Sequence, residues 1–373
     1  MGAEHRPVWA EIDAQALIHN YRLFAALAAP ARICAVVKAD AYGHGAVDVA
    51  RILHEVGCRD FAVAFVDEGV ELRQAGIDGE ILVLSEPAVS DFGVAGDADI
   101  SLTLYSLEAI GIALATRFGK EGKRLSFQLK LDTGMYRAGA SLSDLDRISE
   151  LLEGVDLDGI WSHFAVADLD DPESVAFTKL QIERFRDAVE ALSLKGITAR
   201  QLHIANTAGL LDFPKVRFSK VRVGLGLYGY DPNPKSRSIG LRPVLSLISK
   251  VTFIRQVEQG VRPSYGRLRP IDSDGFLGLV PIGYADGVPR ALFRGGGKVA
   301  INGVLFPFAG MVSMDQSVVD LGPDPRVQIG DRVVLLGSDN PVSIWADEWA
   351  LRTGTISWEI LCGISKRVPR RVV

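Results

Sequence analysis

One lysine stands where a buried strand should end, in the stretch "ICAVVKADAYGHG" (33–45). Lys38 follows an unbroken apolar run and comes shortly before a tyrosine and a glycine-histidine-glycine segment. An amine whose pKa is lowered by loss of water is a nucleophile toward an aldehyde or ketone. Lys38 is therefore a candidate for imine chemistry. For this residue alone, a lysine that ends a strand with its charge in water is the equal alternative.

Polar side chains also stand at the ends of later strand-like runs. They are Lys130 and Arg137 at the fifth run, His163 at the sixth, Asn206 and Thr207 after the seventh, and Arg222 in the eighth. In (β/α)8 barrel enzymes the reacting groups lie at the carboxyl ends of the strands and in the loops that follow. The spacing therefore predicts that these side chains meet at one end of a barrel.

Two glycine-containing segments indicate a phosphate site near the same end. "NTAG" follows the seventh run, and "GLGLYG" (224–229) belongs to the eighth, where barrels usually bind phosphate. A phosphate, a lysine that traps an aldehyde and a barrel together indicate pyridoxal phosphate. "GLGLYG" also matches a dinucleotide-binding pattern, but it continues into "YDPNP", so the helix that such a site requires is missing.

The elements that must position these residues alternate between apolar runs and amphipathic helical segments. The strand-like runs are 31–39, 60–65, 80–85, 99–105, 124–132, 157–165, 199–206 and 220–229. Eight such runs, separated by segments such as the helical pattern ending at Gly196, predict a parallel (β/α)8 TIM-type barrel of the α/β class rather than an open sheet.

After residue 240 the pattern changes. Pro232, Pro234 and Pro243 interrupt any helix, and the following segments alternate between apolar and polar residues with glycine turns. We therefore expect a barrel domain over 1–240 and a C-terminal mostly-β domain over 241–373, with roughly the first ten residues packing with the second domain. A single late helix is expected at "IWADEWALRTG".

Composition restricts the partners. The chain has 373 residues, 48% hydrophobic and 23% charged, with a net charge of −5, which gives no basic surface for nucleic acid. No apolar segment reaches the length of about eighteen residues that a membrane span needs, and a cytoplasmic protein is expected. The three cysteines show neither a disulfide framework nor the spacing of metal ligands, so no metal is expected.

Nine segments in order along the chain resemble bacterial alanine racemases. They are "VWAEIDAQALIHNYR", "AVVKADAYGHG", "LKLDTGMYRAG", "SHFAVAD", "VRVGLGLYG", "RPSYGRLRP", "VPIGYADGVPR", "GMVSMDQ" and "GTISWEILCGISKRVPR". The resemblance implies a homodimeric pyridoxal phosphate enzyme that racemises alanine by a two-base mechanism and supplies D-alanine for peptidoglycan. It also implies that each active site is completed by the partner's C-terminal domain.

The resemblance implies a role for each matching residue on the cofactor side. Lys38 would form the imine with the cofactor and act as the base on one face of the substrate. Arg222 would donate to the ring nitrogen, with His163 as its support. The other cofactor-binding residues would be Tyr42, Asn206, Thr207, Gly224, Leu225 and Trp358, mostly near the phosphate.

On the substrate side, the resemblance implies that Tyr265, contributed by the other subunit, is the second base. A tyrosine with an ordinary pKa near 10 is a weak base at neutral pH, so nearby positive charge must favour its phenolate. Arg137 would bind the substrate carboxylate, and Lys130 matches a lysine that is often carbamylated. The partner would also contribute Tyr284, Met314 and Asp315.

Two residues depart from the family pattern. Trp358 replaces a tyrosine, which removes a hydroxyl and reduces the pocket volume, and Met311 replaces an arginine near the entrance. Three alternatives therefore stay open: a racemase of broader specificity, for example for serine, a related decarboxylase, and a pyridoxal phosphate-binding barrel protein without racemase activity.

Overall fold

The computed structural model describes residues 6–115, 125–233, 239–323 and 326–373. Two residues named in the sequence analysis lie outside these ranges: residue 124, which begins the predicted strand-like run 124–132, and Pro234. The described residues form two compact units. Unit 1 contains residues 6–16, 42–45 and 242–373, and unit 2 contains 17–41 and 46–241.

Unit 2 is a parallel barrel, which confirms the predicted fold class. Its strands are β2 (Arg32–Val36), β3 (Asp60–Val63), β4 (Glu80–Val83), β5 (Leu102–Leu104), β6 (Phe127–Asp132), β8 (Gly159–Trp161), β9 (Leu202–His203) and β10 (Lys220–Val223). They pair in the orders β10-β2-β3-β4 and β5-β6-β8-β9. A bridge between Leu82 and Ser101 joins the two groups, and Arg222 N–H donates to Ala205 O at 3.0 Å on the other side.

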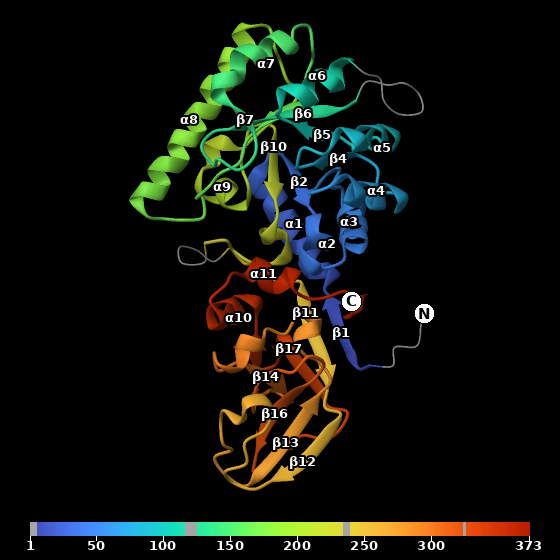
Figure 1. Ribbon diagram of the computed structural model, residues 1–373, viewed down its shortest axis with the longest axis vertical. Helices are drawn as coiled ribbons and strands as arrows, with labels where there is room; N and C mark the ends of the chain where they lie inside the picture. Colours follow the sequence, from blue (N-terminus) through green and yellow to red (C-terminus); the bar gives the residue numbers. More distant parts are fainter. Residues whose placement is uncertain (1–5, 116–124, 234–238, 324–325) are drawn as a thin grey trace. The chain divides into compact units, whose positions relative to one another are not determined.

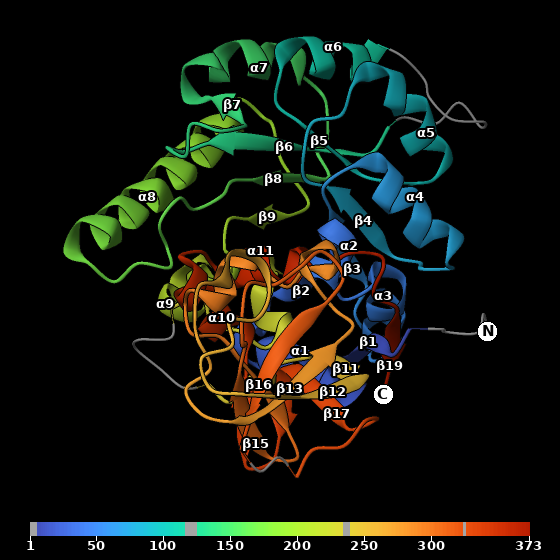
Figure 2. The same cartoon turned by 60° about the horizontal axis from the view of Figure 1, so that its bottom comes forward.

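Helices follow most barrel strands and lie outside them (Figure 1). They are α1 (Ala14–Ala28), α3 (Ala46–Glu55), α4 (Val66–Gln74), α5 (Phe92–Asp97), α6 (Leu107–Ala115), α7 (Leu145–Leu151), α8 (Pro172–Leu194) and α9 (Thr207–Asp212). Helices α6 and α7 lie side by side in both views (Figures 1 and 2). Asp171 caps α8 by accepting from Ser174 N–H, and the helix ends just before Gly196, as its sequence predicts.

Seven of the eight predicted runs extend beyond the end of their strand, and only the fifth ends with it, at Asp132. Two of these differences change the account of the site. The strand before Lys38 ends at Val36, and Lys38 begins the helical segment α2 (Lys38–Gly43). The eighth strand ends at Val223 rather than Gly229, because the backbone bends at Gly224 and continues as a 3-10 helix over Leu225–Tyr228. A Cβ on Gly226 would lie 2.5 Å from the Phe24 ring, so this turn packs closely against α1.

Unit 1 consists mostly of antiparallel strands. One sheet has the order β15 (Val304–Pro307), β14 (Lys298–Ile301), β17 (Arg332–Asp339), β11 (Leu245–Lys250), β1 (Val8–Ile12) and β19 (Arg370–Val372), with β18 (Val342–Ile344) paired to β17. A second sheet contains β12 (Phe253–Val257), β13 (Gly275–Val280) and β16 (Ser317–Gly322). Strand β1, drawn in blue, lies beside β11, so the start of the chain joins a sheet formed by its end (Figure 1).

Unit 1 also has two late helices where the sequence predicts one. Helix α10 (Ala346–Thr353) is the expected one, and α11 (Ser357–Cys362) follows it (Figure 2). The prediction missed α11 because six residues are too few to establish a helical period. Trp358 lies in α11 and is half-buried. No helix in the described ranges combines the length and apolar character needed to span a bilayer.

Candidate active site

Unit 2 brings four cations to the end of the barrel where the strands finish. Lys38 begins α2 after β2, Lys130 lies in β6, Arg137 follows β6, and Arg222 lies in β10. They are close enough that Arg222, Arg137 and Lys38 all lower the pKa of Lys130. Asp132 acts on Lys130 in the opposite direction. This group, the mouth cluster, carries an excess of positive charge.

Lys38 is held at the start of a left-handed helical turn. Ala39, Asp40, Ala41 and Tyr42 all have φ between 52° and 54°. Each residue with a Cβ costs about 1–2 kcal/mol in this conformation, so surrounding contacts must impose it. Such strain is typical of functional sites.

Three contacts hold the turn. Ala39 N–H donates to Glu68 Oε1 at 2.7 Å, and Asp40 Oδ1 accepts from Ala46 N–H at 2.8 Å. Within unit 1, Arg370 Nε donates to Gly43 O at 2.9 Å. A Cβ on Gly43 would lie 2.3 Å from Leu361 O, so only glycine fits there. Glu68 was not among the predicted site residues.

Arg222 is buried and uses both terminal nitrogens to contact its neighbours. Nη1 donates to His203 Nδ1 at 2.6 Å, and Nη2 donates to Ser162 O at 2.7 Å and to His163 Nδ1 at 3.0 Å. The predicted contact between His163 and Arg222 is therefore present. Among the described hydrogen bonds none uses Arg222 Nε, so this N–H is available to a ligand.

Both histidines beside Arg222 are neutral acceptors. Burial and the neighbouring cations, Arg222 above all, hold the pKa of each imidazole well below its usual range. Because a guanidinium only donates, each Nδ1 must carry a lone pair. Burial likewise lowers the pKa of Arg222 to about 10, which leaves it charged at neutral pH.

Trp161 forms one wall of the mouth cluster. The Arg222 guanidinium lies 4.5 Å and Lys130 Nζ 4.6 Å from the centre of its ring. The His203 imidazole is nearly parallel to it, at 5.7 Å between centroids. Burial and nearby Arg222 and Arg137 lower the pKa of Lys130 to about 8. A neutral Lys130 amine is a nucleophile, which fits the carbamylation expected from the sequence.

The predicted phosphate side is also assembled in unit 2. Asn206 caps α9 by accepting from Gly209 N–H at 2.9 Å, and Gly224 N–H donates to Thr207 Oγ1 at 3.3 Å. Leu225 begins the 3-10 helix after Gly224. The two remaining residues predicted for this side lie in unit 1: Trp358 is half-buried, and Tyr42 is buried, with a pKa raised by burial and by Cys362.

The residues expected from a partner lie in unit 1 and are exposed. Tyr265, Tyr284 and Met314 are 70%, 42% and 52% accessible. Ser264 Oγ donates to Met311 O at 2.6 Å beside Tyr265, and Asp315 accepts from Arg367 Nη2 at 2.6 Å. Met311 itself is buried, so its side chain packs in the core of unit 1.

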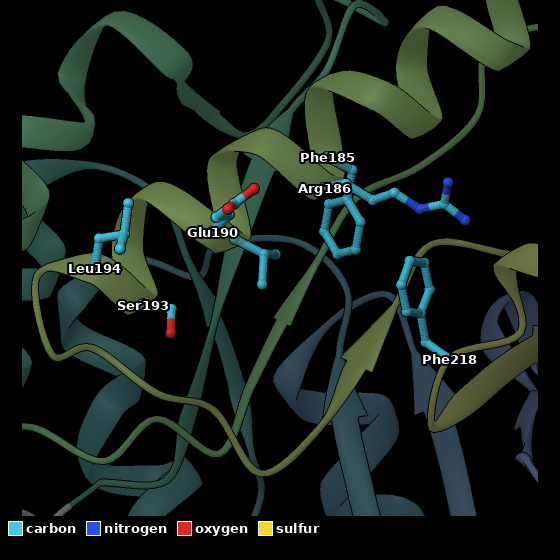
Figure 3. A pocket seen from close by; sticks show the side chains of 7 residues that line it. Phe185, Arg186, Glu190, Ser193, Leu194 and Phe218 are labelled. Atoms are coloured by element: carbon cyan, nitrogen blue, oxygen red, sulfur yellow. The ribbon is translucent and has the colours of Figure 1, made fainter.

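The sequence reasoning missed His203, Trp161 and Gln128, which lie in β9, β8 and β6 and are all buried. A signal was present for His203, because a polar residue inside an apolar strand run needs a partner. A pocket of about 420 Å³ is lined by Phe185 and Glu190 on α8 and by Phe218, and no candidate residue lines it. Figure 3 shows these side chains. Within the described residues, no group of three or more side chains could hold a metal ion.

The residues fit pyridoxal phosphate on three observations. Arg222 Nε–H is a donor without an acceptor among the described hydrogen bonds, as the pyridine nitrogen requires. The mouth cluster has a cation excess that a phosphate and a substrate carboxylate would balance. Lys38 stands among these cations, where an amine can meet an aldehyde.

Family models match most of the chain. The model of the alanine racemase N-terminal domain covers residues 12–232, and that of the C-terminal domain covers 244–372. A protein named alanine racemase from Carboxydothermus hydrogenoformans is 40% identical over 98% of this chain and 99% of its own length. One from Clostridium tetani is 38% identical over 98% and 95%.

Solved structures resemble this chain equally well. The alanine racemase of Bacillus anthracis with bound L-Ala-P has a TM-score of 0.91 and 35% identity, covering 99% of this chain and 95% of that one. The alanine racemase of E. faecalis has a TM-score of 0.91 and 31% identity over 100% and 99%.

Proposed function

The chain belongs to the alanine racemase family and is a pyridoxal phosphate-dependent alanine racemase, and we propose that Lys38 and Tyr265 are its two bases. The observation that best supports this proposal is the mouth cluster, in which Lys38 lies close enough to Lys130 and His163 to lower the pKa of each. Neither the broader racemase nor a non-racemase barrel is favoured by the comparisons.

We assign the cofactor to residues 1–240. Arg222 would donate from Nε to the ring nitrogen, and His163 keeps the guanidinium in place. Thr207, Gly224 and Leu225 would bind the phosphate, with Asn206 shaping the turn. When bound, pyridoxal phosphate withdraws electrons from the substrate α-carbon and makes its proton acidic.

Lys38 would hold or take the α-proton on one face of the substrate. The left-handed turn fixes the direction in which its side chain leaves the backbone. Arg137 would bind the substrate carboxylate as a fork of two N–H donors. Lys130, once carbamylated, would change from a repelling cation to an anion that pairs with Arg137.

Tyr265 would serve the opposite face from a second copy of the chain. Its exposure in unit 1, together with that of Tyr284 and Met314, supports a contribution to another subunit's site. Residues 241–373 would thus supply the second base and, with Asp315, the substrate entrance. We infer a homodimer with shared active sites, located in the cytoplasm and supplying D-alanine for peptidoglycan.

The test uses the protein loaded with pyridoxal phosphate. L-alanine should yield D-alanine until the two are nearly equal, as followed by chiral chromatography. Lys38→Ala should abolish turnover, whereas Tyr265→Ala should block exchange of the α-proton with deuterated water from one enantiomer in particular. Equal and mild losses from both variants would contradict the assignment of the two bases. Lys179→Ala, an exposed position on α8, is the matched control and should keep full activity.

A further inference from the structure

A chain of hydrogen bonds, buried as far as Gln128, connects Arg222 to the half-buried carboxylate of Glu80. Arg222 Nη1 contacts His203 Nδ1 at 2.6 Å, and His203 Nε2 contacts Gln128 Oε1 at 2.7 Å. Gln128 Nε2 donates to Glu80 Oε1 at 2.6 Å. Gln128 and His203 are both fully buried, so water does not compete for these bonds.

The direction of every bond in this chain is fixed by its two ends. Arg222 can only donate, so His203 Nδ1 accepts and the proton of the neutral ring must lie on Nε2. A carboxylate can only accept, so the NH2 group of Gln128 must face Glu80. The amide oxygen of Gln128 therefore faces His203, where it accepts the Nε2 proton.

The opposite orientation of the Gln128 amide would break the chain. Its NH2 group would then face His203 and require a lone pair on Nε2, which would move the ring proton to Nδ1. That proton would point at the Arg222 Nη1 donor, and two donors would face each other in a dry interior. The orientation of the Gln128 amide thus determines whether His203 Nδ1 can accept the hydrogen bond from Arg222 Nη1.

The other contacts of Glu80 keep its carboxylate ionised, so that it can only accept hydrogen bonds. Its Oε2 atom accepts from Lys220 Nζ at 2.8 Å and from Gln201 Nε2 at 2.7 Å. Burial acts to raise the pKa of Glu80, but Lys220 and the hydrogen bonds lower it on balance. Glu80 is therefore an anion at neutral pH, and it orients the amide.

Space for the amide is provided by the neighbouring strand. A Cβ on Gly159 in β8 would lie 2.5 Å from Gln128 Oε1 and 2.8 Å from its Cδ. A larger residue at 159 would displace the amide from the position in which it contacts His203.

We propose that Gln128 is a positioning residue for Arg222, acting through the tautomer of His203. The inference rests on the proposed role of Arg222 at the ring nitrogen of the cofactor. With Nη1 and Nη2 both held by neighbours, the guanidinium presents Nε–H in a fixed direction. Without the Gln128 contact, His203 loses its anchor, and Arg222 Nη1 keeps only the longer bond to His203 O, at 3.4 Å, while Nη2 stays held by Ser162 O and His163. The guanidinium then has more freedom to tilt about Nη2.

The first measurement needs no variant of Gln128. In apoprotein labelled with 15N-histidine, two-bond 15N–1H correlation spectra distinguish the two neutral tautomers and the imidazolium, and a His203→Gln variant assigns the signals. We expect the proton of His203 on Nε2. A proton on Nδ1, or a doubly protonated ring at neutral pH, would overturn the proposal whatever the protein catalyses.

The second measurement compares two cofactors in binding to apoprotein. One is pyridoxal phosphate, and the other is its analogue with carbon in place of the ring nitrogen, which cannot accept from Arg222. Gln128→Met should weaken pyridoxal phosphate about tenfold, the equivalent of one lost hydrogen bond, and leave the analogue within twofold. Gly159→Ala should show the same pattern.

Gln201→Met is the matched control, because Gln201 donates to the same carboxylate but does not contact His203. It should change neither affinity by more than about twofold. Equal weakening of both cofactors by Gln128→Met would indicate a merely structural role and overturn the proposal, as would no change in either. If the wild-type protein binds both cofactors with equal affinity, Arg222 does not donate to the ring nitrogen. The proposed role of Arg222 and the affinity change predicted for Gln128→Met would then both be wrong.

Discussion

The two ends of the barrel interior balance their charges in opposite ways. At the floor, which is the end where the strands begin, the Lys220 side chain is fully buried. Its Nζ atom lies 2.7 Å from Asp60 Oδ1 and 2.8 Å from Glu80 Oε2, so carboxylates of the protein pair with its charge. At the mouth, the pKa of Lys130 is lowered by the neighbouring cations Arg222, Arg137 and Lys38. The carboxylate of Asp132 acts in the opposite direction. The floor thus pairs its cation with carboxylates, whereas several cations lie close together at the mouth, and we expect the mouth to bind anions.

The same contrast appears in how each end changes pKa values. Burial acts to lower the pKa of Lys220, but Cys34 and the two carboxylates raise it on balance. Burial also lowers the pKa of Lys130, and there the neighbouring arginines add to the shift. The buried charge of Lys220 at the floor thus stabilises the fold, whereas the buried charge of Lys130 at the mouth destabilises it.

The largest expected effect is at the floor. Lys220→Met removes the buried cation that pairs with Asp60, which is buried, and Glu80, which is half-buried, and leaves Asp60 only the more distant Arg32, at 3.4 Å. We expect the free energy of unfolding in urea to fall by about 3 kcal/mol. The triple variant with Asp60→Asn and Glu80→Gln should recover much of this loss, because no charge is then left unpaired. A loss below about 1 kcal/mol for Lys220→Met would show that the floor is not a matched set.

The next effect is a pH dependence at the mouth. The pKa of Lys130 is about 8 in the fold and near 10.5 when unperturbed, so the unfolded chain binds the extra proton between these values. Stability of the apoprotein should therefore rise with pH across this window, by about 2 kcal/mol, relative to Lys130→Met. Urea titrations in buffer free of carbon dioxide measure the difference, and a difference that stays flat or falls would contradict the assigned pKa.

The smallest effect is stabilisation of the mouth by an added anion. Inorganic phosphate at millimolar concentration should raise the melting temperature of the apoprotein by a few degrees beyond sodium chloride of equal ionic strength. Lys130→Met should reduce the rise, while Lys179→Met, on the exposed face of α8, should not. An identical rise in all three proteins would place the anion elsewhere.

Much of the barrel could be predicted because each strand run is apolar and short. The positions of Lys130, His163 and Arg222 followed from that pattern and from the rule that barrel strands end at one side. His203 and Gln128 could not be assigned, because a single polar residue in a buried strand does not reveal its partner. The partner of each is more than 15 residues away in the chain.

The turn after Lys38 was unpredictable for a different reason. Left-handed backbone is usually signalled by glycine or asparagine, and "ADAY" contains neither. Contacts from Glu68 and Arg370 impose the turn, and no local pattern in the sequence specifies such distant partners. The nine segments of resemblance instead predicted a set of site residues, without any account of their geometry.

The left-handed turn also has a consequence for the order in which the nascent chain can be completed. Four residues in this conformation oppose folding by about 4–8 kcal/mol in total, so the turn does not persist before its supports exist. One support is Arg370, which donates to Gly43 O and lies 332 residues after Lys38 in the chain. On the ribosome, Lys38 therefore leaves the exit tunnel long before its final geometry can form. A growing or truncated polypeptide thus carries this reactive amine without the finished site around it.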